Sequence, residues 1–564
     1  MNRLKITITK KEETMKKHLL KTRLLSFAAL CGIALAFASC TKDDVAQNPA
    51  KPNEEENKNL TTFVAGGENK NLTTFVAGGE NKTRTSMDYN SGDFYWEADD
   101  YIYVKDDDGV LRKSTNAPTS KVASFKYTVP GKFTASTSYK VYYFGKNSSN
   151  NQVVIPSAQS QSTPNNTEHF GVSGDYGTAT ATGSVGGKTF SFQLEHQAAY
   201  LVFHPYVSNT LLQNCYLTKI EVSSDNDIAS TYTLNASTGT LQSVSTGAEA
   251  DKEIILSTKG SGTYANGFPL NTASDNVAVN GAYMVIKPGT HTLKVRYWLK
   301  DVSTGIEGTV TKAFKAFNYD VNNYYDIDGN LNIRDYDGDH YYMWDAQEQY
   351  WKGHEWNHGG SQPTLNDGLP NATTSSDYAQ SNTDSRYYHW GSGSLFNATH
   401  TSCKDLPNAN ELAWYAAYGD PRWDADELWT TMGHLYKGGM WFKKKSVLQA
   451  ESHYDTEKSA DGTTDMRTTQ NVYTNNSSSI NNSGLPSAVD AGNYFYLPAL
   501  GVYSSGHLNL AGDYGHYWSS SAYPWFSGMY PWLSENAYLM MFNSSYVTVV
   551  SDSRVSGCRV GRFE

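Results

Sequence analysis

His354, Glu355 and His358 are the residues of this chain whose spacing most directly suggests catalysis, because they satisfy the pattern H-E-x-x-H. In zinc proteases the pattern requires a helix, so that both histidines bind the metal from one face and the glutamate acts as base. Here Gly353 precedes the motif and Gly359-Gly360 follows it. These flanks disfavour a helix, so we predict that the chain is not an enzyme and keep a zinc metalloprotease as a remote alternative.

A second candidate site consists of aromatic residues. Tyr523, Trp525, Tyr530 and Trp532 form two Tyr-Pro-Trp units between two predicted strands. Proline is excluded from central strands, so we place these residues on a loop. Exposed rings of this kind stack on the C–H faces of sugars or pack against a protein. Ligand binding is one interpretation, and a small core within the loop itself is the other.

Two acidic runs, Asp326–Asn330 and Asp335–Asp339, resemble calcium-binding loops in composition. Both lack the glutamate that such loops carry at position twelve. We therefore predict Asp-Gly turns at a domain junction, with one structural calcium ion as the alternative and no other cofactor. Among the cysteines, Cys403 and Cys558 are the pair that we expect to form a disulfide, and Cys215 is expected to be a buried apolar residue.

The first 39 residues read as a secretion signal that precedes Cys40. Basic residues lead into the apolar run 24–39, which is shorter than the roughly 20 residues needed to span a membrane. Small residues directly before Cys40 resemble a lipobox, which implies an acylated, palmitate-bearing cysteine in the outer-membrane lipid. A plain secretory signal is the alternative, and translation starts at Met1 or Met15.

The segment after Cys40 is acidic at first and then rich in Pro, Asn, Glu and Lys, so residues 40–59 form a flexible tether. Thr41–Asp44 resembles the export tag of Bacteroidetes surface lipoproteins, which implies a surface-exposed location. The net charge is −11 without a basic stripe, so nucleic acid is not an expected partner.

Residues 56–67 are repeated without change at 68–79, and each copy contains the strand-like segment Leu-Thr-Thr-Phe-Val-Ala. Two copies are too few for a solenoid. Either a first strand has been duplicated without consequence, or two equivalent strands compete for one position in a sheet.

Strands with period-two alternation follow as far as about residue 333, which predicts two β-sandwiches over 60–205 and 206–333. The order of four segments resembles the fimbrillin-like family of type V pilus proteins: 83–102, Leu194–Phe203, Ala282–Gly289 and Asn322–Ile327. The resemblance implies secretion as a lipoprotein, proteolytic cleavage after an arginine that follows the first strand, and assembly with other pilins by β-strand donation. Arg84 has the required type and position, although it can equally be a surface residue of a loop.

The amino-acid composition changes near residue 335, where Trp, Tyr and Gly become more frequent. Asn408 and Glu411 have the spacing of a capping box, and Leu412, Tyr415, Ala416 and Gly419 share one helical face. Three segments resemble the major-paralogous-domain family: this helix start, Tyr517–Ser521 and Gly557–Arg562. The resemblance implies an α+β, C-type-lectin-like domain over 335–564. The formylglycine-generating relatives use a cysteine pair near the C-terminus, and only Cys558 is present here.

These observations predict a mainly β protein with tandem sandwiches and a C-type-lectin-like end. We expect a surface lipoprotein of the outer membrane that becomes a fimbrial tip subunit and adhesin. Its C-terminal domain is expected to bind a glycan or protein, and its last strand to leave no extension to donate. A monomeric glycan-binding lipoprotein outside any pilus is the alternative.

Overall fold

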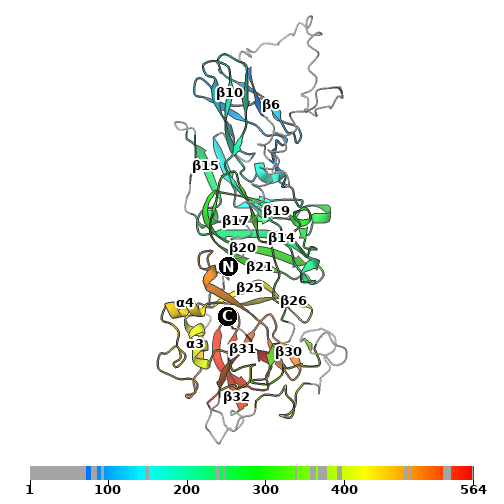
Figure 1. Ribbon diagram of the computed structural model, residues 1–564, viewed down its shortest axis with the longest axis vertical. Helices are drawn as coiled ribbons and strands as arrows, with labels where there is room; N and C mark the ends of the chain where they lie inside the picture. Colours follow the sequence, from blue (N-terminus) through cyan, green and yellow to red (C-terminus); the bar gives the residue numbers. More distant parts are fainter. Residues whose placement is uncertain are drawn as a thin grey trace, which may run out of the picture.

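The computed structural model describes residues 72–77, 86–89, 94–146, 151–235, 240–244, 248–336, 340–355, 364–365, 378–389, 397–475, 480–482, 484, 486–524, 535–561 and 563–564. Over these residues the chain is mainly β, as predicted, and its sheets follow one another along an elongated molecule (Figure 1). None of the helices described is long and apolar enough to cross a membrane.

An eight-stranded sheet forms one end of the molecule, in the order β5-β4-β7-β10-β11-β1-β6, with β12 paired to β10. Its apolar side chains bury one cluster that includes Phe75, Tyr127 and Phe190. The strands are β1 (Leu72–Ala77), β4 (Tyr103–Lys105), β5 (Leu111–Lys113), β6 (Phe125–Pro130), β7 (Ser138–Tyr143), β10 (Gly177–Gly183), β11 (Thr189–Phe192) and β12 (Glu195–His196), while β2 (Ser86–Met87) and β3 (Phe94–Tyr95) pair with each other.

The middle of the molecule contains long antiparallel strands with the expected alternation. Buried and partly exposed residues alternate along most of β20, whereas β13 and β19 are buried on both faces. The elements are β8 (Gln152–Ile155), β9 (Ala158–Ser160), β13 (Ala199–Phe203), β14 (Cys215–Ser224), β15 (Ser230–Leu234), β16 (Leu241–Ser243), β17 (Glu253–Ser257), β18 (Phe268–Pro269), α2 (Val277–Asn280), β19 (Ala282–Ile286), β20 (Gly289–Asp301), β21 (Glu307–Tyr319) and β22 (Tyr324–Ile327).

Strands on the two sides of residue 205 pair with one another. β8, β9 and β13 precede that residue, yet they pair with β15, β17 and β19 respectively. The largest core cluster likewise joins Phe144 and Phe170 to side chains beyond residue 205, as far along the chain as Leu435. The two halves therefore share one core, and the boundary at 205 remains a prediction from sequence.

The nine-stranded sheet continues from the middle of the molecule into the C-terminal part. Its order is β28-β26-β25-β21-β20-β14-β17-β9, with β18 paired to β14. Strands β21 and β25 are neighbours in the molecule (Figure 1), and they pair in parallel at Thr309 and Glu427. The strands beyond β21 are β25 (Arg422–Thr431), β26 (His434–Lys443) and β28 (Tyr494–Pro498).

Buried polar groups surround the pairing of β21 with β25, which is called the junction below. The Glu427 carboxylate accepts hydrogen bonds from the Thr309 hydroxyl at 2.9 Å and the Thr311 hydroxyl at 2.7 Å. Arg296 Nη2 forms an ion pair with Asp424 Oδ1 at 3.1 Å. Burial, and then the negative charge of Asp424, raise the pKa of Glu427 to about 7.

The C-terminal part combines a six-stranded sheet, in the order β23-β34-β31-β32-β33-β27, with two helices and a smaller sheet. Helix α3 packs against β27 and β33. The elements are β23 (Tyr341–Tyr342), β24 (Thr364–Leu365), α3 (Ala409–Tyr418), α4 (Lys445–Ala450), β27 (Tyr473–Asn475), β29 (Val502–Ser504), β30 (His507–Asn509), β31 (Gly515–Ala522), β32 (Asn536–Phe542), β33 (Val547–Ser553) and β34 (Cys558–Arg559).

The predicted start of α3 is confirmed. Asn408 accepts the backbone N–H of Glu411 at 3.0 Å, and the Glu411 carboxylate accepts the backbone N–H of Asn408 at 2.8 Å. Leu412, Tyr415 and Ala416 are buried, so the apolar face read from the sequence is the face that packs on the sheet. The capping box therefore fixes where this helix begins.

Candidate functional site

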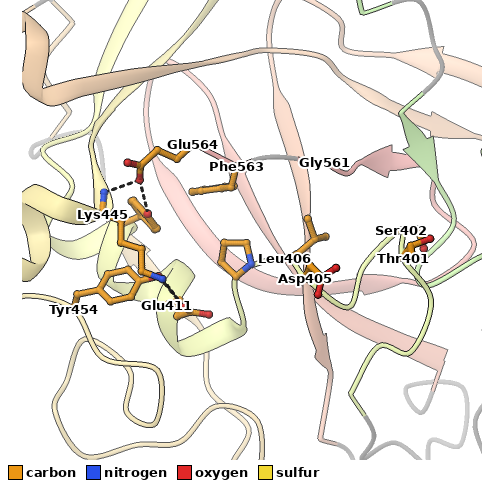
Figure 2. A pocket seen from close by; sticks show the side chains of 12 residues that line it. Thr401, Ser402, Asp405, Leu406, Glu411, Lys445, Tyr454, Gly561, Phe563 and Glu564 are labelled. Atoms are coloured by element: carbon orange, nitrogen blue, oxygen red, sulfur yellow. Dashed lines mark hydrogen bonds and ion pairs between the residues drawn. The ribbon is translucent and has the colours of Figure 1, made fainter. Parts of the chain in front are cut away.

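A cleft of about 540 Å³ lies where α3 begins, between the loop 401–407, the first residue of α4 and the last residues of the chain (Figure 2). Leu406-Pro407 ends the loop on one side, and the capping box turns the chain into α3. The lining residues are Thr401, Ser402, Asp405, Leu406, Pro407, Glu411, Tyr415, Lys445, Tyr454, Gly561, Phe563 and Glu564.

Acidic groups dominate the cleft. Asp405, Glu411 and Glu564 contribute three carboxyl groups to the lining, against the single ammonium of Lys445. Lys445 Nζ lies 3.4 Å from Glu411 Oε1 and 4.7 Å from the centre of the Tyr454 ring. The excess of carboxylates favours a ligand that donates hydrogen bonds or carries positive charge.

Aromatic side chains complete the cleft and order its acids. The Tyr454 hydroxyl donates to Glu411 Oε1 at 2.7 Å, and the Tyr415 hydroxyl donates to Glu564 Oε2 at 3.2 Å. Burial and these carboxylates raise the pKa of both phenols, so they stay protonated and act as donors. Of the aromatic rings in the lining, Tyr454 is half-buried, whereas Tyr415 and Phe563 are buried. One partly exposed ring beside several acids suits a polyhydroxylated or amine-bearing ligand.

Asp345 positions the loop that leads into the cleft. Its carboxylate is fully buried and accepts the backbone N–H groups of Thr399 and His400, both at 2.8 Å. The same residue has a left-handed backbone, with φ of 55°, which costs energy in a residue that carries a Cβ atom. These hydrogen bonds offset that cost, so Asp345 is a structural anchor of the loop.

Asp345, His389 and His400 also form a group that could hold a metal ion, since their ligand atoms lie within 4.8 Å of one another. However, Asp345 Oδ2 already accepts bonds from the Thr399 N–H and, at 2.6 Å, from His389 Nδ1. His400 Nδ1 points at the Asp345 carbonyl oxygen. A metal ion would have to replace these bonds, so we regard the group as a hydrogen-bonded loop anchor. Sequence reasoning missed it because positions 345, 389 and 400 have no recognisable spacing.

The zincin-like motif does not begin on a helix. His354 and Glu355 follow a turn and have no helical conformation, while His358 lies outside the described residues. Glu355 Oε1 instead accepts the backbone N–H of Gly353 at 3.2 Å. The two described residues therefore lack the helical face that the zinc-protease geometry requires.

Only the first of the four predicted ligand-binding aromatics is described. Tyr523 is half-buried and packs edge-on against Tyr538, with ring centres 5.1 Å apart. Its backbone N–H donates to the Asn536 carbonyl at 3.1 Å, which ties the start of the loop to β32. Tyr523 is thus a supporting residue of the core. Trp525, Tyr530 and Trp532 lie outside the described residues, as do Cys40 and Arg84.

The predicted disulfide is absent. Cys403 and Cys558 are both free and buried, in one cluster with Trp344 and Trp518. Burial raises the pKa of the Cys403 thiol to about 12, and burial also raises the pKa of the Cys558 thiol. Cys403 instead accepts the backbone N–H of Asp345 at 3.2 Å. The expectation that Cys215 is a buried apolar residue is confirmed.

The acidic runs contribute hydrogen bonds to the structure around them. Asp326 Oδ1 accepts the Tyr89 hydroxyl at 2.8 Å, and Asp328 accepts the backbone N–H of Asn330 at 3.0 Å. Asp335 Oδ1 accepts the Thr430 hydroxyl at 3.1 Å across the junction. Residues 337–339 lie outside the described part, so the alternative of one calcium ion there stays a prediction.

No protein-family model and no curated protein matches this sequence. Among solved structures, a candidate cell adhesion protein of Bacteroides ovatus is 13% identical, with 46% of this chain and 92% of that chain covered, at a TM-score of 0.30. A fimbrial protein of Bacteroides ovatus is also 13% identical, covering 49% and 53% at a TM-score of 0.22. The fimbrial anchor protein Mfa2 of Porphyromonas gingivalis is 13% identical, covering 42% and 80% at 0.20. Such low scores do not define the fold or function of this chain.

Proposed function

We propose that the chain is a surface lipoprotein that acts as a fimbrial tip subunit and adhesin, assembled by strand exchange and binding its ligand through the C-terminal part. The observation that carries the proposal is the position of β1. This strand precedes every other described element in the sequence, yet it lies inside the eight-stranded sheet, antiparallel to β6 and parallel to β11. One short segment at the beginning of the fold thus completes its first sheet.

The position of β1 between β6 and β11, called the slot below, is lined by apolar side chains. Phe75 is fully buried, and its ring centre lies 5.2 Å from that of Phe133 and 5.4 Å from that of Phe190. Ala77 is 2% exposed. Removal of β1 would expose this surface together with the pairing groups of two strands, which is a template for the strand of a neighbouring subunit.

A single cut would suffice to release β1. The connection from β1 to β2 consists of residues 78–85 and contains Arg84, while β2 pairs with β3 on the other side of the cut. In this proposal Cys40 delivers the protein to the outer membrane as a lipid-anchored precursor. Cleavage after Arg84 then removes the lipid, the tether and both copies of the repeated strand.

The ligand end of the proposed adhesin is the C-terminal part, where the cleft offers acids and aromatic rings in one place. The continuous sheet through β21 and β25 supports a fixed orientation of this part. The rival function, a monomeric glycan-binding lipoprotein, uses the same cleft without strand exchange.

Immunogold labelling of the C-terminal part on whole cells tests the assembly. We expect gold at filament ends for the wild type, and a uniform cell-surface halo for Arg84→Gln. Lys82→Gln is the matched control, because it removes a neighbouring positive charge without touching the proposed cut, and it should label filament ends. A halo for the wild type would refute the tip subunit and favour the monomeric alternative.

A glycan array with the full-length protein tests ligand binding. Tyr454→Phe removes only the hydroxyl that orders Glu411, and Asp405→Asn removes one of the three carboxylates of the lining. If the cleft binds the ligand, both variants weaken the wild-type signal, while Lys437→Met on β26 leaves it unchanged. Equal binding by all four proteins would exclude the cleft.

A further inference from the structure

We propose that the slot accepts either copy of the repeated strand, so that the intact protein populates two registers that differ by one repeat. In the structure the second copy, Leu72–Ala77, forms β1. The first copy, residues 60–65, has the same six side chains in the same order, and the residues that flank it on both sides are also the same.

Within the described part of the chain, the contacts of β1 come from those six residues. Phe75 fills the space between Phe133 and Phe190, and Phe63 occupies the same position in the first copy. The backbone register runs from Leu72 opposite Pro130 to Ala77 opposite Phe125. A shift by one full repeat preserves every one of these pairs, whereas a shift by one residue would turn Phe75 away from the core. The two registers are therefore discrete and have equivalent contacts.

The difference between the registers lies in the connection to β2. With the second copy in the slot the connection consists of residues 78–85, and with the first copy it extends over 66–85. The probability of closing a flexible loop falls with about the 3/2 power of its length. The longer connection is about two and a half times the shorter, so the second copy should be favoured by about fourfold. The first copy would then occupy the slot in about one molecule in five.

Cysteine cross-linking of the uncleaved monomer measures the two registers directly. Thr74 lies opposite Thr128 on β6, and both residues are partly exposed. Thr74→Cys/Thr128→Cys reports the second copy, and Thr62→Cys/Thr128→Cys reports the first. Cys31 and Cys40 are replaced by serine in every variant, and Cys215, Cys403 and Cys558 are buried. Thr61→Cys/Thr128→Cys is the control, since residue 61 would face the opposite side of the strand.

After brief oxidation and peptide mapping we expect both reporter pairs to cross-link, at a ratio of about four to one, and the control pair to remain reduced. Adding Phe75→Ala should make the 62–128 link the main product, and adding Phe63→Ala should abolish it. A 62–128 yield no higher than that of the control, with or without Phe75→Ala, would overturn the proposal. The measurement uses purified monomer, so its outcome is independent of whether the protein enters a fimbria.

Discussion

The slot and the junction are two places where this chain completes a sheet with a distant segment, and they are built in opposite ways. β1 is held in the slot by backbone pairing and by apolar side chains such as Phe75 and Ala77. β25 meets β21 in a single register pair, surrounded by the buried polar groups of Glu427, Asp424 and Arg296. A strand with the same alternation and a large apolar side chain at the position of Phe75 satisfies the first arrangement, whereas the second depends on a specific set of buried polar side chains. The first arrangement belongs to the end of the molecule that we propose to be exchangeable, and the second forms a joint held by specific polar contacts.

The junction is also closed sterically. Gly308 on β21 faces the β25 backbone so closely that a Cβ atom would lie 2.4 Å from the Asp426 carbonyl oxygen. No flexible side chain can move aside there, because the neighbouring atom belongs to the backbone. By contrast, the slot is completed by a segment that a single proteolytic cut would detach from the fold. Exchange is therefore expected only at the N-terminal end.

The largest effect is expected from removing both aromatic anchors of the slot. Phe63→Ala/Phe75→Ala should destabilise the first sheet by about 3–5 kcal/mol, as for other Phe→Ala changes in cores. Phe75→Ala alone should lower the stability by only about 1 kcal/mol. In that variant the first copy, which occupies the slot in about one wild-type molecule in five, takes the place of the second copy. Hydrogen exchange of the β6 and β11 amides measures the loss of stability in the double variant and in the single variant. A single variant as unstable as the double would show that the copies are not equivalent.

Breaking the ion pair of the junction should have a comparable effect on the stability of the C-terminal part. Arg296→Met leaves Asp424, whose side chain is 2% exposed, without its cationic partner, and we expect a loss of about 3 kcal/mol. Calorimetry should show the C-terminal transition at lower temperature. Lys300→Met is the control, because Lys300 lies on the same strand as Arg296 and forms a partly exposed pair with Glu307 on β21; it should change little. If both variants unfold alike, the junction is not held by this pair.

The pH dependence of stability should be set in part by Glu427. Its pKa is raised on folding, so its contribution is fully present below about pH 4.5 and is lost as the pH rises through about 7. The decline should amount to roughly 3 kcal/mol at most. In Glu427→Gln that decline is absent. In denaturant titrations the free energy of unfolding of the variant should therefore rise relative to that of the wild type between pH 5 and 8. Parallel curves for the two proteins would contradict a raised pKa.

The smallest effect concerns the wall of the cleft. Asn408→Ala removes the side-chain half of the capping box and should cost about 1 kcal/mol. Asn408→Asp keeps an acceptor at this position and should restore most of the loss, as urea titration can measure. Equal losses in both variants would indicate that Asn408 acts through its contact with the Thr456 carbonyl instead.

The sequence predicted the elements whose patterns are local. Period-two alternation predicted strands before residue 333, as seen in β20, and the Asn408–Glu411 spacing predicted the start of α3. Contacts between distant residues were not predictable in this way. The cleft combines residues near 405, 445 and 564, and the Asp345 anchor joins positions that share no spacing. The disulfide prediction failed because two cysteines can share a core as buried thiols without forming a bond.

Mass spectrometry of the N-terminus of the protein in isolated filaments tests the exchangeable end most directly. If the slot is vacated for a neighbouring subunit, the protein in filaments begins at Thr85, and the acylated Cys40 and both repeat copies are missing. Filaments in which the chain still begins at Cys40 would contradict the proposed strand exchange.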